Sequence, residues 1–88
     1  MKPKFTGFNG LELAGVSETV GAETVTAILR DSNQDILFAT GTTVPTDATT
    51  GYAKGCLFID TDVATGTGSL YLNKGVNTAC VFTLVTQA

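Results

Sequence analysis

The stretch from Gly51 to Val85, GYAKGCLFIDTDVATGTGSLYLNKGVNTACVFTLV, decides the fold predicted for this chain. It contains three short runs rich in aromatic and aliphatic residues, and the residues between them are mainly Gly, Thr, Asn and Asp. Glycine permits the positive φ angles that tight turns require, so each gap indicates a turn or a loop. We therefore predict a three-stranded meander whose strands are Cys56–Asp60, Ser69–Asn73 and Cys80–Val85.

Both faces of this predicted meander carry apolar side chains. The run Cys56–Ile59 is apolar throughout, and residues 81–85 are nearly so, whereas a sheet with one face in water would alternate apolar and polar residues. We expect a cover on both sides, either a second sheet built from residues 23–40 or another chain. The middle run alternates better, and places Tyr71 and Asn73 on one face, where the tyrosine hydroxyl provides a polar tip.

The upstream half of the chain predicts a hairpin followed by a linker. Residues 23–40 contain a short helical spacing of apolar residues, but also many β-branched residues and a turn-forming Asp31–Asn33 cluster. We prefer a hairpin of Thr24–Arg30 with Asp35–Thr40 over a helix. Residues 41–55, which are rich in Thr and Gly and include a proline, predict an irregular loop that crosses one face of the domain.

Residues 1–22 hold four glycines and no sustained period, so they predict an extended arm. Four large apolar side chains on this arm indicate either an anchor that packs elsewhere, such as on a neighbouring subunit, or a tail that folds back over its own sheet. The sequence leaves both open. The candidate interface residues are Phe5, Phe8, Leu11, Leu13, Tyr52 and Tyr71.

These patterns predict a single, mostly β domain over residues 1–88, as a small antiparallel β-sandwich or barrel-like domain. Its parts are an extended arm (1–22), a hairpin and linker (23–50) and a C-terminal meander (51–86). The chain is 43% hydrophobic and only 15% charged, with a mean hydropathy of +0.25, whereas an average soluble domain carries about 25% charge. Because so short a chain has a modest core, we expect it to associate with copies of itself or with a larger surface.

Composition also argues against several functional classes. The net charge is −3 and the five basic residues are scattered, so we expect no nucleic-acid partner. No apolar run approaches the ~20 residues of a membrane-spanning helix, and no signal peptide is evident, so we expect folding in a cytoplasm and no membrane partner. Histidine is absent, which removes the usual general base and nucleophile pairs. We expect no enzymatic activity, no small-molecule substrate and no cofactor.

Two acidic residues and two cysteines are the remaining candidates for chemistry. Asp60 and Asp62 could face one side of a strand, as in a Ca²⁺ site, but the glutamate of a calcium-binding loop is missing, and a strand end that bonds its own turn is favoured. Cys56 and Cys80 are predicted on the first and third strands, about 9–10 Å apart and beyond disulfide reach of ~7 Å. We interpret them as small buried hydrophobes, although another strand order would permit a disulfide. No metal site is predicted.

The pattern GYAKGCLFIDTD, then GSLYLNKG, then CVFTLV resembles the C-terminal half of short proteins encoded beside tailed-phage major capsid genes. In those head decoration, cement or head-fibre proteins, a glycine-led strand ending in Asp-Thr precedes a Leu-Tyr-x-Asn strand, a glycine turn and a closing aromatic-aliphatic strand. The upstream GTTVPT at 41–46 also fits the resemblance. One departure is that relatives often carry a tryptophan in the closing strand, where this chain has Phe82 and no tryptophan.

The resemblance implies a non-enzymatic virion structural protein that binds the outside of a phage capsid and stabilises the head through subunit contacts. The implied partners are the major capsid protein and copies of the same chain, as a homotrimer. The implied location is the capsid exterior, after synthesis in the host cytoplasm. Similar strand-turn cassettes also occur in phage tail fibres, so the alternative is a tail-fibre or receptor-binding virion module. The family has no catalytic residues to transfer.

Overall fold

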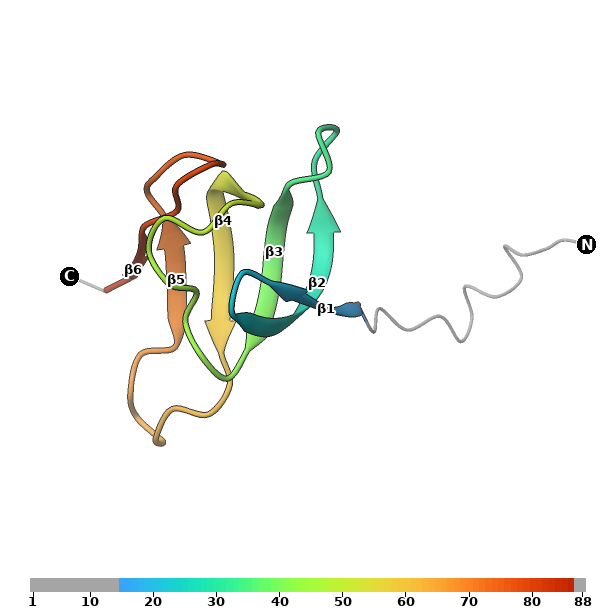
Figure 1. The fold of residues 1–88 in the computed structure, drawn as a ribbon. Helices are drawn as coiled ribbons and strands as arrows, with labels where there is room; N and C mark the ends of the chain where they lie inside the picture. Colours follow the sequence, from blue (N-terminus) through green and yellow to red (C-terminus); the bar gives the residue numbers. More distant parts are fainter. Residues whose placement is uncertain (1–14, 87–88) are drawn as a thin grey trace, which may run out of the picture.

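The protein folds as one curved, mixed β-sheet (Figure 1). The computed structural model describes residues 15–86. The strands follow one another across the sheet in chain order, and every neighbouring pair is antiparallel except β3 and β4, which are parallel. The mostly β class is therefore confirmed. The strands are β1 (Val16–Val20), β2 (Glu23–Arg30), β3 (Ile36–Gly41), β4 (Tyr52–Asp60), β5 (Leu70–Asn73) and β6 (Phe82–Leu84).

The two local motifs predicted from the sequence are present. Strands β4, β5 and β6 form the antiparallel meander, and β2 and β3 form the hairpin, which excludes the helix considered for residues 23–40. The hairpin turn depends on Asp31, whose carboxylate accepts hydrogen bonds from the backbone N–H groups of Asn33 (2.9 Å) and Asp35 (3.0 Å). This is the turn chemistry expected of that cluster.

Three larger expectations were wrong. Residues 23–40 do not form a second sheet over the meander, because β3 joins β4 edge to edge in the same sheet. The parallel β3–β4 pair also means that the sheet is not wholly antiparallel. Finally, residues 16–20 of the predicted arm form β1, because Gly21 adopts a left-handed φ of 63° and closes a tight hairpin with β2. Residues 1–14 lie outside the described residues.

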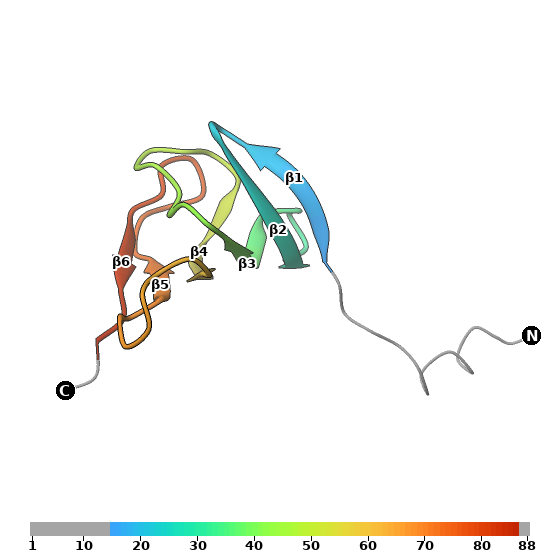
Figure 2. The ribbon, with the colours of Figure 1, turned by 90° about the horizontal axis from the view of Figure 1, so that it is seen from below.

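The linker between the parallel strands lies on the concave side of the sheet (Figure 2). Residues 42–51 run back from the end of β3 to the start of β4, as a parallel connection must. Backbone hydrogen bonds attach this linker to the turn before β6, from Ala48 N–H to the Cys80 carbonyl (2.8 Å) and from Gly51 N–H to the Asn77 carbonyl (2.9 Å). A loop that crosses one face, predicted for residues 41–55, is thus present over residues 42–51, whereas Gly41 belongs to β3 and residues 52–55 belong to β4.

The core lies between this linker and the concave, or inner, face of the sheet. Nine buried residues form one cluster there, with Val44 of the linker, Tyr71 and Phe82 packed against it. The side chains of Phe58 and Phe82 contribute aromatic contacts, with ring centroids 5.9 Å apart. The buried cluster consists of Val20, Val25, Ala27, Ile36, Ala39, Tyr52, Cys56, Phe58 and Cys80.

Candidate functional site

A row of large apolar side chains crosses the opposite, convex face of the sheet. The strand register places Leu29 opposite Phe38, Phe38 opposite Leu57, and Leu57 opposite Leu72. Residues paired across neighbouring strands share a face, so these four side chains stand in line over β2, β3, β4 and β5. We call them the outer row, and the face that carries them the outer face.

The outer row is partly exposed to solvent. Leu29 is 56% exposed and Leu57 is 39% exposed, while Phe38 and Leu72 are half-buried. The adjacent row on the same face contains Ile59 opposite Leu70, which widens the apolar surface over β4 and β5. All strands of residues 15–86 belong to this one sheet, so among them no second sheet covers the outer face. An apolar surface of this kind is typical of a protein–protein contact.

Tyr52 was wrongly predicted as an interface residue. Its side chain is fully buried on the inner face, and its ring contacts that of Phe82 edge-on at a centroid distance of 5.2 Å. The register between β3 and β4 is irregular next to it, passing from Ile36 opposite Tyr52 to Phe38 opposite Leu57, and Gly55 takes a φ of 85°. Tyr52 has the same parity as Cys56 and Phe58 and lies on their face, but the sequence-based prediction placed it in the linker and began the strand only at Cys56.

Tyr71 is also on the inner side, opposite Phe58, and is half-buried against the core. It therefore does not belong to the outer row. The four arm residues Phe5, Phe8, Leu11 and Leu13 lie outside the described residues. The outer row was not predicted as a site from the sequence. The feature that could have indicated it is the apolar character of both faces of the predicted meander.

Asn73 connects parts of the inner face with four hydrogen bonds. Its side chain is 1% exposed, and its amide NH₂ donates to the carbonyls of Tyr52 (3.2 Å) and Ala53 (2.9 Å). Its amide oxygen accepts from the N–H groups of Gly75 (2.9 Å) and Val81 (2.8 Å). The carbonyls of the β4 bulge therefore have a buried donor, which satisfies groups that the irregular ladder leaves free.

The ionisable groups on the inner side of the sheet are structural. The Asp60 carboxylate accepts a hydrogen bond from Asp62 N–H (3.2 Å), the strand-end contact expected of this pair, and its hydrogen bond to the Asp62 side chain raises the pKa of Asp62. Within residues 15–86, no group of three or more acidic, Cys or His side chains is placed to hold a metal ion.

Cys56 and Cys80 are free, buried thiols, as interpreted from the sequence. Burial, together with the nearby Cys80, raises the pKa of Cys56 to about 12, so this thiol stays protonated and unreactive.

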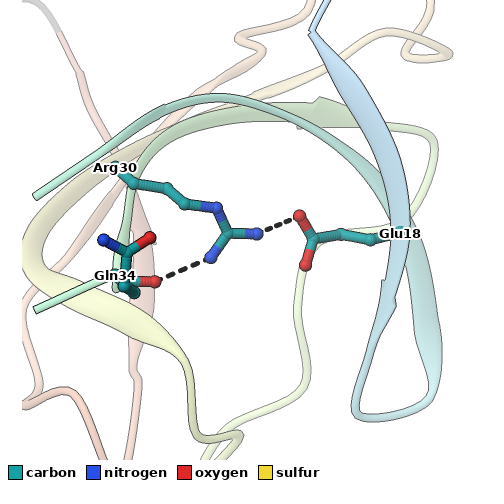
Figure 3. Close-up of polar contacts among 3 residues, drawn as sticks. All are labelled: Glu18, Arg30 and Gln34. Atoms are coloured by element: carbon teal, nitrogen blue, oxygen red, sulfur yellow. Dashed lines mark hydrogen bonds and ion pairs between the residues drawn. The ribbon is translucent and has the colours of Figure 1, made fainter.

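An ion pair on the inner side of the sheet links β1 to β2 (Figure 3), because Glu18 is opposite Val25 and Arg30 is opposite Ile36. The Arg30 guanidinium pairs with the Glu18 carboxylate of β1 and donates to the Gln34 carbonyl at 2.7 Å. One side chain thus connects β1, β2 and the β2–β3 turn. Because both charged groups are about one-third exposed, the pair contributes less than about 1 kcal/mol to the free energy of unfolding.

Comparisons with protein-family models, curated proteins and solved structures find no match to this chain. No helix within residues 15–86 has the length and apolar character needed to cross a membrane. Two features therefore bear on function: the outer face, and the sequence pattern of residues 51–85.

Proposed function

We propose that this chain is a non-enzymatic structural protein that binds the surface of a larger protein assembly. The observation that carries the proposal is the outer row, a line of four apolar side chains on a face that no described element covers. The inner face already supplies a closed core, so the outer apolar groups are available for a partner. At about 25 cal/mol per Å² of buried apolar surface, covering such a face favours association.

The proposed assembly is the exterior of a tailed-phage head, where the chain acts as a decoration or cement protein. The resemblance of residues 51–85 to proteins encoded beside major capsid genes supports this choice of partner. Each copy would contact the major capsid protein and neighbouring copies, as a homotrimer. Many copies that bind only the assembled shell would stabilise it by mass action, even where each contact is weak.

A binding experiment with phage heads tests the proposal. Heads that lack this chain are incubated with the purified protein, sedimented, and analysed for bound copies per capsid subunit. We expect the wild type to bind at a stoichiometric, capsid-like copy number. We expect Leu57→Lys to bind at least tenfold more weakly, because a lysine in the outer row must be desolvated on docking, which costs about 1.4 kcal/mol or more.

Val76→Lys is the matched control, because Val76 is 49% exposed in the turn before β6 and lies outside the outer row. We expect its head binding to equal that of the wild type. Equal binding by Leu57→Lys would remove the outer row from the interface, and no binding by the wild type would contradict the capsid proposal. A few copies per particle, confined to the tail, would instead indicate the fibre or receptor-binding module.

A further inference from the structure

Strand β6 is one open edge of the sheet. Figures 1 and 2 both show it at one end of the sheet, with no described segment beyond it. Among residues 15–86 it pairs only with β5, so one side of its backbone has no partner strand there. A strand edge of this kind is a template on which another strand can pair.

The hydrogen bonds of β6 show which of its backbone groups face that open side. The Val81 carbonyl accepts a hydrogen bond from the residue that follows β5 (2.8 Å), and Val85 N–H donates to the first residue of β5 (2.8 Å). Thr83 lies midway between them and is also paired with β5. Because the backbone groups of successive residues point to alternate sides of an antiparallel strand, the N–H and C=O groups of Phe82 and Leu84 face the open edge.

The open edge is apolar and has none of the features that usually prevent pairing. Three of the exposed large apolar side chains belong to five consecutive residues, as Val81 (43%), Leu84 (37%) and Val85 (43%). Residues 75–88 contain no charged side chain and no proline, whereas lysine, proline and bulges protect many sheet edges. The opposite edge differs, because β1 is mostly polar and carries the charged Glu18.

We propose that β6 pairs with β6 of a second copy of this chain, antiparallel about a two-fold axis at Thr83. Phe82 then exchanges backbone hydrogen bonds with the partner's Leu84, and Leu84 does so with the partner's Phe82. The edge is therefore complementary to itself, as a two-fold contact requires. The groups that form these bonds are the ones that face the open side, so the pairing breaks none of the hydrogen bonds between β5 and β6.

This register also covers the exposed side chains of the edge. On the outer face, Val81 lies opposite the partner's Val85, and Thr83 lies opposite the partner's Thr83, a favourable pair in antiparallel sheets. These pairs are not hydrogen-bonded, so their Cα atoms are only about 4.5 Å apart and the valines of the two copies come into contact. On the inner face, Leu84 lies opposite the partner's Phe82. Every exposed apolar side chain of the edge thus meets one of its own kind or an aromatic ring.

The pairing extends the outer face across both copies. Thr83 is opposite Leu72, so the outer rows of the two copies fall in one line with the Thr83 pair between them. The consequence for docking rests on the proposed function, in which the outer row contacts a larger assembly: two paired copies offer that assembly a wider apolar face than one copy. The contact leaves the outer row uncovered, and it can connect copies that belong to different trimers.

Cysteine cross-linking of the free protein tests the pairing without any capsid. The natural thiols, Cys56 and Cys80, are buried, so the wild type is a background that should not cross-link. In Thr83→Cys the two introduced thiols lie on directly opposite residues, within the Cα separation of about 4.4–6.8 Å that a disulfide requires. We expect the oxidant diamide to convert most of this variant into a covalent dimer, seen on a non-reducing gel.

Val81→Cys and Val85→Cys are the matched controls, because each residue lies two positions from the two-fold axis. Its copy in the partner is then four residues away along the strand, or about 14 Å at ~3.4 Å per residue, which is beyond disulfide reach. We expect each variant alone to cross-link at least about tenfold more slowly than Thr83→Cys. A mixture of the two should cross-link quickly, since Val81 lies opposite the partner's Val85.

The pattern of cross-links also gives the results that would overturn the proposal. No covalent dimer of a folded Thr83→Cys would do so, because the edge would then be free or covered by a different segment. Equal rates in all three variants would indicate random collision, and fast cross-linking of Val85→Cys alone would indicate another register; either result rejects pairing at Thr83. Should Thr83→Cys alter the circular dichroism spectrum, the mixture of Val81→Cys and Val85→Cys decides the question by the same criteria. None of these outcomes depends on capsid binding, so the pairing and the proposed function can fail separately.

Discussion

The two faces of this sheet are built on the same strands but differ in how completely their side chains are buried and hydrogen-bonded. The inner face is closed by the 42–51 linker, holds the nine-residue core and contains Asn73 with all its hydrogen bonds made. The outer face also carries large apolar side chains but has no described element above it. Stability therefore resides on the inner face, and the outer face can serve binding without threatening the fold.

Two phenylalanines on neighbouring strands give the sharpest contrast between the faces. Phe58 is fully buried on the inner face, whereas Phe38 is half-buried in the outer row. Truncating a buried phenylalanine removes its transfer free energy and leaves a cavity, so we expect Phe58→Ala to lower the free energy of unfolding by about 4 kcal/mol, and Phe38→Ala by about 1 kcal/mol. Urea unfolding monitored by circular dichroism measures both. The milder pair Phe58→Leu and Phe38→Leu keeps the comparison measurable if Phe58→Ala unfolds, and equal losses would show that the faces are energetically alike.

Asn73 allows the polar part of the inner face to be tested separately. Asn73→Asp keeps the acceptor oxygen but places a carboxylate oxygen against the carbonyls of Tyr52 and Ala53, which then lack their donor. We expect a loss of about 3 kcal/mol in the free energy of unfolding at pH 7. The loss should shrink at pH 3, where the introduced carboxyl group is protonated and can donate a hydrogen bond once more.

Asn33→Asp is the control for that change, because Asn33 is exposed and contributes only its backbone N–H to the β2–β3 turn. We expect an effect within about 0.5 kcal/mol. A similar loss in both variants would indicate that added negative charge, and not the missing donor, is responsible.

The local motifs of this fold could be predicted from sequence because their signals are local. The β2–β3 hairpin follows from β-branched residues around the Asp31 turn, and the meander follows from apolar runs separated by glycine. β1 was missed because Val16–Val20 is short and polar, and its strand character depends on pairing with β2. The parallel β3–β4 contact was missed because it depends on a linker whose path is fixed by hydrogen bonds to the distant Cys80 turn.

The outer row could not be predicted because it exists only in the register. No spacing in the sequence marks its four residues, Leu29, Phe38, Leu57 and Leu72. They align only because the register between β2 and β3 shifts on both sides of the Leu29–Phe38 pair. Tyr52 was misplaced for a different reason: β4 begins at Tyr52 and not at Cys56, so Tyr52 joins Cys56 and Phe58 on the inner face. Simple alternation gives the face of a residue only as far as the nearest bulge.

The buried thiol of Cys56 makes the inner face sensitive to alkali. Its pKa rises from an ordinary value of 9.0 to about 12 in the folded protein, chiefly through burial. Below pH 9 both folded and unfolded chains hold the proton, so stability is constant there. Above pH 9 the unfolded chain loses the proton first, so we expect the free energy of unfolding to fall by up to about 1.4 kcal/mol per pH unit towards pH 12.

Urea unfolding at pH 8, 9, 10 and 11 measures this slope, with Cys56→Ala as the comparison. The slope should become shallower in the variant, but should not vanish, since burial also raises the pKa of Tyr52. Identical slopes would show that the Cys56 thiol does not titrate differently on unfolding.

The smallest expected effect concerns the buried hydroxyl of Tyr52 on the inner face. Among the side chains of residues 15–86, the Tyr52 hydroxyl is the buried polar group that has no hydrogen-bond partner. Burying such a group without a partner is unfavourable, while the ring itself packs well against Phe82. We expect Tyr52→Phe to keep the packing and to raise the free energy of unfolding by about 1 kcal/mol, seen as a higher urea midpoint.

Tyr71→Phe provides the matched control, since Tyr71 is only half-buried and removing its hydroxyl should change the free energy of unfolding little. Its urea midpoint should stay close to that of the wild type. A loss of stability in Tyr52→Phe would mean that the hydroxyl is satisfied in solution by a buried water. A gain in stability would show that the unpaired Tyr52 hydroxyl destabilises the fold, and that the packing and the Asn73 hydrogen bonds of the inner face more than offset this cost. The outer face has no comparable packing among the described residues.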